Sequence, residues 1–210
     1  YLNGKTDEKT GRFWQRERMI DELYRAHEDY DNMNNLASDS ANAGRVETMR
    51  AALRSWQLEI FDSGFIPEDD MNRLANAEGL TVYEYVRRAD LYPLEDYINL
   101  ADLTLELDPS NLAGFVSGLE SQDLGICYWS TLGILNLTLV GDAANTPAVK
   151  SALLKKLADS GESELIRGYI AWILIRIGER EAGFAFLEEI IEKTYTPRTV
   201  INVLDWMEEP

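Results

Sequence analysis

Two apolar segments of similar pattern recur at a spacing of forty residues. The stretches ICYWSTLGIL (126–135) and IRGYIAWILI (166–175) match at an offset of 166 − 126 = 40, and TVINVLDWM (199–207) is a looser third copy. Helix pairs of this period, with an amphipathic helix before a more buried one, are typical of HEAT-like α-solenoids. Antiparallel helix pairs in general share the pattern. The repeat therefore predicts a mainly α fold of antiparallel helix pairs that bury their apolar faces by stacking.

Hydrophobic residues at helical spacing divide the chain into two predicted domains. Residues 91–210 are predicted to be a HEAT-like helical-repeat domain, because apolar stripes there follow one another with short turns between them. Residues 1–90 are predicted to be irregular and helical, with at most a short strand around Glu22–Tyr24. The helices expected after residue 90 span 94–105, 112–119, 124–139, 146–157, 166–177, 184–191 and 196–206.

One long helix is expected within the first domain. Its apolar residues recur every three or four positions and so fall on one face, and they are Val46, Met49, Leu53, Trp56 and Ile60. We interpret Trp56, like Trp129, Trp172 and Trp206, as a core residue rather than as part of a sugar-binding platform.

Local signals mark where several helices begin. Pro67 followed by Glu68, Asp69 and Asp70 suits a helix start, because proline needs no N–H partner there and acids face the positive end of the helix dipole. The sequence Thr81-Val82-Tyr83-Glu84 predicts a capping box. Thr146-Pro147 and Thr196-Pro197 predict two later starts.

The charge of the chain argues against nucleic acid and anionic membranes as partners. Twenty basic and thirty-seven acidic residues give a formal charge of −17, whereas phosphates attract clustered Lys and Arg. The uncharged run 124–140 is short for a membrane span and contains Gly125, Ser130, Gly133 and Asn136. It is expected to be a buried helix.

The stretch DELYRAHEDYDNMNNLA (21–37) is crowded with acids and amides, which raises the question of a metal site. An EF-hand loop starting at Asp29 would need an oxygen ligand at its fifth position, glycine at its sixth and glutamate at its twelfth. Those positions hold Met33, Asn34 and Ser40. We therefore interpret the stretch as a turn whose side chains bond their own backbone.

No catalytic, cofactor-binding or metal residue is assigned. His27 and Cys127 are the sole histidine and cysteine, a hundred residues apart, and Cys127 lies in an apolar helix where a thiol behaves as a small hydrophobe. The acids Glu68, Asp69 and Asp70, and the pair at 188–189, fit helix starts and helix faces better than acid–base catalysis. The sequence has neither a phosphate-binding glycine loop nor a Gly-x-Ser-x-Gly elbow.

Three stretches resemble the end of bacterial sulfatases of the heparan (N-sulfoglucosamine sulfohydrolase) type. FWQRERMIDELYRAHEDYDNMNNLASD (13–39) is similar to the family's Glu-Leu-Tyr, acidic turn and Asn-Asn-Leu-Ala. VETMRAALRSWQLEIFDSGFIPEDDM (46–71) is similar to its closing helix and Gly-x-Ile-Pro-Glu exit. Residues 91–135 are similar to a HEAT-like extension of some members. Departures occur at Arg25-Ala26, at Asp29-Tyr30 and at Cys127, where the family often has arginine.

The resemblance implies that the catalytic machinery lies upstream of this sequence. Sulfatases carry Cys/Ser-x-Pro-x-Arg, matured to formylglycine beside a calcium ion, and no proline here has Cys or Ser two positions before it. The chain is thus expected to be the non-catalytic C-terminal part of a sulfatase-like hydrolase, inactive alone. Its partner would be the upstream catalytic domain, its distant ligand a sulfated glycan, and its location periplasmic or secreted. The alternative is a free-standing helical-repeat module that binds another protein.

Overall fold

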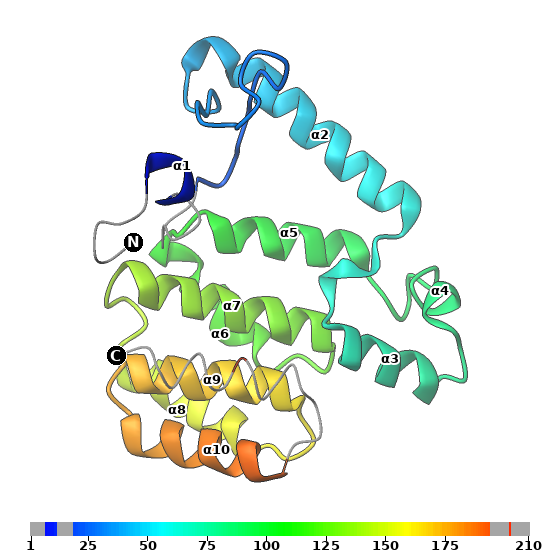
Figure 1. Cartoon of the computed structure of the whole chain (residues 1–210). Helices are drawn as coiled ribbons and strands as arrows, with labels where there is room; N and C mark the ends of the chain where they lie inside the picture. Colours follow the sequence, from blue (N-terminus) through cyan, green and yellow to red (C-terminus); the bar gives the residue numbers. More distant parts are fainter. Residues whose placement is uncertain (1–6, 12–18, 194–201, 203–210) are drawn as a thin grey trace. The chain divides into compact units, whose positions relative to one another are not determined.

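The computed structural model describes residues 7–11, 19–193 and 202, and the described chain is helical with no strand (Figure 1). The mainly α prediction is confirmed. Glu22–Tyr24 is not a strand, since a single backbone bond among the described residues, Leu36 N–H to Leu23 O at 2.8 Å, joins this segment to the following one. Apart from residue 202, the expected helix over 196–206, Trp206 and the third repeat copy lie outside the described residues. The α-helices are α1 Glu8–Gly11, α2 Ala43–Ile60, α3 Glu68–Ala77, α4 Val82–Tyr85, α5 Leu94–Leu105, α6 Leu112–Gly118, α7 Leu124–Val140, α8 Pro147–Leu157, α9 Glu164–Arg176 and α10 Arg180–Lys193, with 3₁₀ turns η2 Ser40–Asn42, η3 Ser63–Phe65 and η4 Pro109–Asn111.

The chain divides into two compact units, 1–60 and 61–210. The sequence-based division was at residue 90 instead. Residues after 60 group with the later part of the chain because side chains from that part reach back to them. Tyr92 donates its hydroxyl to Asp62 O at 2.8 Å, and the Trp129 indole N–H donates to Phe65 O at 2.9 Å.

Side-chain caps begin several helices where the sequence predicted them. Thr81 and Glu84 form the expected capping box. The Thr146 side chain accepts a hydrogen bond from the Val149 N–H, and Pro147 is the first residue of the helix. Asp123 and Ser163 cap α7 and α9 in the same way. Each cap satisfies a backbone N–H that the first helical turn leaves without a partner.

Helices α5, α7 and α9 form a layer in which all three run in the same direction (Figure 1). The Tyr97 hydroxyl at the start of α5 donates to both carboxylate oxygens of Asp123 at 2.9 Å, at the start of α7. Near the other end, the Asn136 amide of α7 donates to Thr104 O at 3.2 Å. α9 is aligned with α7 in the same direction. Cys127 near the start of α7 contacts Glu162 in the turn before α9, and Arg176 at the end of α9 donates a hydrogen bond to Thr138 O near the end of α7.

Helices α6, α8 and α10 pack against this layer. α6 runs antiparallel to α7, since Phe115 lies against Gly133 while Gly118, further along α6, lies against Ser130. α10 turns back on α9, so that Gly183 near its start contacts Ala171 and Ile175 near the end of α9.

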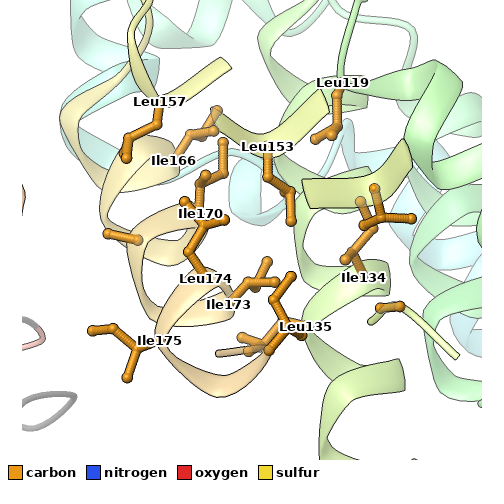
Figure 2. Packing of buried hydrophobic residues seen from close by; sticks show 14 of the residues in the cluster. Leu119, Ile134, Leu135, Leu153, Leu157, Ile166, Ile170, Ile173, Leu174 and Ile175 are labelled. Carbon is orange, nitrogen blue, oxygen red and sulfur yellow. The ribbon is translucent and has the colours of Figure 1, made fainter. Parts of the chain in front are cut away.

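The core of the second unit lies between α7, α8 and α9 (Figure 2). Ile166, Ile170 and Leu174 of α9 are fully buried beside Leu153 of α8. Ile134 of α7 lies on the other side of Leu153 from α9. The uncharged helix α7 is thus a buried helix, as its composition predicted. Within the described residues no helix is both long enough and apolar enough to cross a membrane.

Candidate functional site

The acid- and amide-rich stretch 21–37 is organised by hydrogen bonds from its side chains to its own backbone. The Asn35 amide oxygen accepts from Leu23 N at 2.9 Å and Ala37 N at 3.0 Å, and its nitrogen donates to Asp21 O at 2.9 Å. The Asp29 carboxylate accepts from the backbone N–H groups of residues 33 and 34, at 2.9 and 2.8 Å. The turn interpretation of this stretch is confirmed. His27 is exposed within it.

Arg50 connects this stretch to helix α2. Its guanidinium donates to both carboxylate oxygens of Asp21, with Nε at 2.8 Å from Oδ1. The hydrogen bond from Arg50 holds the pKa of Asp21 below its usual range. The ordered stretch is therefore fixed to one side of α2.

Nothing in the described part of the first unit covers the apolar stripe of α2. Met49, Leu53 and Trp56 are 56%, 52% and 55% exposed, Ile60 is 40% exposed, and none of the residues of α2 is buried. The helix formed as expected, but the expectation that Trp56 lies in a core is wrong. We call Met49, Leu53, Trp56 and Ile60 the α2 stripe. Helical spacing reports which residues share a face, and it carries no information on what the face packs against.

The acids at the start of α3 have different surroundings. Asp70 is buried and accepts from Ser163 Oγ at 2.6 Å and from Arg73 at 3.0 Å. Asp69 and Glu68 are exposed. Asp70 therefore ties α3 to the cap of α9, a contact across 93 residues that local sequence does not reveal. Of the other acid pair, Glu189 bonds Lys193 at 2.8 Å on the surface of α10.

Cys127 lies in a closed polar cluster rather than at an accessible site. Its thiol is buried, 3.5 Å from Glu162, whose carboxylate binds Lys156 at 2.6 Å. Burial, with the Glu162 charge second, raises the pKa of Cys127 to about 12, so the nucleophilic thiolate is scarce at neutral pH. Burial acts to lower the pKa of Lys156, and the hydrogen bond to Glu162 outweighs it and raises that pKa. No sequence pattern indicates this pairing.

An aromatic cluster connects α7, α9 and the segment before α3. The Tyr128 ring lies 5.4 Å from the Trp129 ring and 6.2 Å from the Tyr169 ring, and Trp129 lies 5.9 Å from Phe65. Trp129 and Trp172 are half-buried. Trp172 packs against the hydrophobic core, as predicted, whereas Trp129 contacts Phe65 and Tyr128.

A cavity of about 630 Å³ opens beside this aromatic cluster. This volume lies within the range of small-molecule sites in proteins. Its wall combines buried apolar side chains with the polar groups of Ser63, Glu68 and Asn72. Sequence patterns could not find it, since its residues come from separate segments. They are Ser63, Gly64, Ile66, Pro67, Glu68, Met71, Asn72, Val82, Tyr128, Leu165, Tyr169 and Asn202.

The described residues contain no group of three or more His, Cys, Asp or Glu side chains placed to hold a metal ion. The chain matches no protein-family model, no curated protein and no solved structure. The sulfatase resemblance therefore stays a prediction, and the two candidate surfaces are the α2 stripe and the cavity.

Proposed function

We propose that this chain is the non-catalytic C-terminal part of a sulfatase-like hydrolase, and that the α2 stripe docks on the catalytic domain of that enzyme. The observation that carries the proposal is the exposure of four large apolar residues on one face of an 18-residue helix. Contiguous exposed apolar surface of this kind marks interaction sites. The sulfatase class comes from the resemblance of residues 13–39, 46–71 and 91–135.

The ordered stretch 21–37 supports a docking role. Asn35, Asp29 and the Arg50–Asp21 pair fix the backbone beside α2. A surface that is rigid before binding loses less conformational entropy on association. The same-direction layer of α5, α7 and α9, with α6 and α10 antiparallel to it, supports the HEAT-like interpretation of the second unit.

The first test is turnover of an aryl sulfate. The isolated chain is expected to give no sulfate release above background, because it lacks Cys/Ser-x-Pro-x-Arg. Turnover by the purified chain would contradict the non-catalytic assignment.

The second test compares α2 in the isolated chain and in a longer polypeptide that includes the upstream catalytic domain. Backbone amides of α2 are expected to exchange hydrogen more slowly in the longer protein, and Trp56→Ser should abolish that protection. Ala51→Ser places the same residue at an exposed position on the opposite face of this helix, so it is the matched control and should leave the protection unchanged. Equal exchange of α2 in both proteins would overturn the docking proposal.

The alternative is a free-standing module whose α2 stripe binds a separate protein. An upstream reading frame that lacks Cys/Ser-x-Pro-x-Arg, together with protection of α2 by a separate polypeptide, would favour this alternative over the sulfatase proposal.

A further inference from the structure

Met49 is the sulfur-containing member of the α2 stripe. It precedes Leu53 and Trp56 by about one and two helical turns, so the three side chains share one face of α2. Met49 is 56% exposed in the folded chain. A surface that covers Leu53 and Trp56 must therefore also cover Met49.

Exposure separates Met49 from other methionines of the chain. Met71 of α3 is 3% exposed and buried in the second unit, whereas Met19 is 60% exposed and lies before α2, outside the stripe. Oxidation of a methionine requires that the oxidant reach the sulfur. The fold therefore leaves Met49 and Met19 open to oxidation and shields Met71. Of these three methionines, only Met49 belongs to the α2 stripe.

Oxidation changes the polarity of this side chain. The methionine thioether is apolar and adapts to an irregular partner surface, whereas the sulfoxide is polar and accepts hydrogen bonds. In the free chain the sulfoxide stays hydrated, because more than half of Met49 is in water. In a docked stripe it is buried against an apolar surface, where a polar group without a partner is unfavourable. Oxidation therefore leaves the fold intact and disfavours docking.

We propose that Met49 is an oxidation site that controls docking of the α2 stripe, with hydrogen peroxide as the oxidant. A lone pair of the thioether sulfur attacks one peroxide oxygen, the O–O bond breaks and an S–O bond forms. The sulfur loses two electrons and the peroxide gains them. The displaced hydroxide takes the proton from the transferred oxygen and leaves as water. The inference rests on the docking role proposed for the stripe.

Docking and oxidation exclude each other. A docked stripe covers the Met49 sulfur, so peroxide reacts with the molecules in which the stripe is uncovered. The sulfoxide then keeps those molecules undocked. Methionine sulfoxide reductases reverse the modification with two thiols, which become a disulfide while the oxygen leaves as water.

The first part of the test uses the isolated chain and does not involve docking. After treatment with hydrogen peroxide, peptide mass spectrometry should show Met49 and Met19 oxidised at similar rates, and Met71 at least about tenfold more slowly. The oxidised chain should melt at the same temperature as the untreated chain. Oxidation of Met49 as slow as that of Met71 would overturn the inference.

The second part uses the longer polypeptide that includes the upstream catalytic domain. Once Met49 is fully oxidised, the backbone amides of α2 should exchange hydrogen about tenfold faster or more than before treatment. Met49→Leu keeps the stripe apolar and cannot form a sulfoxide, so it should retain the protection of α2 after the same treatment. Met19→Leu removes a methionine of similar exposure outside the stripe, and this control should lose the protection as the parent does.

The outcomes separate this inference from the docking proposal. Lack of α2 protection in the untreated longer polypeptide would overturn the docking role and this inference with it. If α2 is protected before treatment, two results would overturn the oxidation site alone. One is protection that survives full conversion of Met49 to the sulfoxide, and the other is an equal loss of protection in the Met49→Leu variant.

Discussion

Helix α2 of the first unit has no buried residue, whereas α9 of the second unit buries Ile166, Ile170, Ile173 and Leu174 completely. α2 carries a single apolar stripe, and α9 is apolar on nearly all sides and is covered by α7, α8 and α10. The contrast teaches that an amphipathic helix can be well formed and still lack the surface that stabilises it. In α9 that surface belongs to the same unit, and for α2 we propose that it belongs to another domain.

The sharpest way to break this comparison is to truncate a leucine in each helix. Leu174→Ala in α9 should lower the free energy of unfolding by about 3–5 kcal/mol, because it leaves a cavity in a packed core. Leu53→Ala in α2 should change it by less than about 0.5 kcal/mol, since the side chain is already half in water. Urea denaturation measures both, and a large loss from Leu53→Ala would show that α2 is covered within this chain.

Thiol labelling sharpens the same contrast in chemical reactivity. Cys127 should react with iodoacetamide much more slowly in the folded chain than in urea, because the thiol is buried and burial raises its pKa to about 12. A Leu53→Cys variant that also carries Cys127→Ser places a thiol on the α2 stripe and should react as fast folded as unfolded. Rapid labelling of native Cys127 would contradict the closed cluster with Glu162 and Lys156.

The same thiol predicts a loss of stability at alkaline pH. Its folded pKa lies above the unfolded value, so its contribution is complete below the ordinary thiol pKa and falls as pH rises toward about 12. Across that window the Cys127→Ser variant should lose less stability with rising pH than the parent chain. Parallel curves of unfolding free energy against pH for the two proteins would count against this prediction.

Glycine substitutions compare a tight helix contact with an open one. A Cβ at Gly183 would lie 2.6 Å from the Ala171 carbonyl oxygen, so Gly183→Ala should destabilise the second unit by about 1–3 kcal/mol. Gly114→Ala in α6 meets nothing within 4 Å and should stabilise by about 0.5–1 kcal/mol. Thermal melting of the two variants is the measurement, and shifts of the same sign would refute the packing of α10 on α9.

The smallest expected effect concerns a buried hydroxyl in α7. Ser130 Oγ has no hydrogen-bond partner among the described residues, although the residue is 1% exposed. Ser130→Ala should therefore raise the free energy of unfolding by up to about 1 kcal/mol. Thr131→Val in the same turn removes a hydroxyl that bonds Cys127 O at 2.8 Å, and it is the control expected to destabilise. A stability loss from both variants would mean that Ser130 has a partner in solution.

Local sequence was sufficient to predict those features that depend on interactions between residues close together in the chain. The caps at Thr81 and Thr146, the bounds of α5 and the turn-forming role of Asp29 and Asn35 depend on residues a few positions apart. The burial of α7 also followed from composition, because an uncharged helix must be covered.

The candidate sites could not be predicted in the same way. The Asp70–Ser163 bond and the cavity join residues that are far apart in the chain, so no spacing rule reveals them. Trp56 was assigned to a core because its helix face is apolar, and the absence of a covering surface within the described part of the first unit became visible only in three dimensions.

By itself, the sequence determined that this protein is a mainly α-helical chain of capped helices, because helix formation and capping are decided within a few turns. Only the tertiary structure shows which apolar helix faces are covered by other helices. Only the tertiary structure shows that Asp70 is buried and hydrogen-bonded whereas Glu68 lines the cavity. Those outcomes depend on how helices pack, and packing brings together side chains whose separation in sequence has no fixed relation to their distance in space.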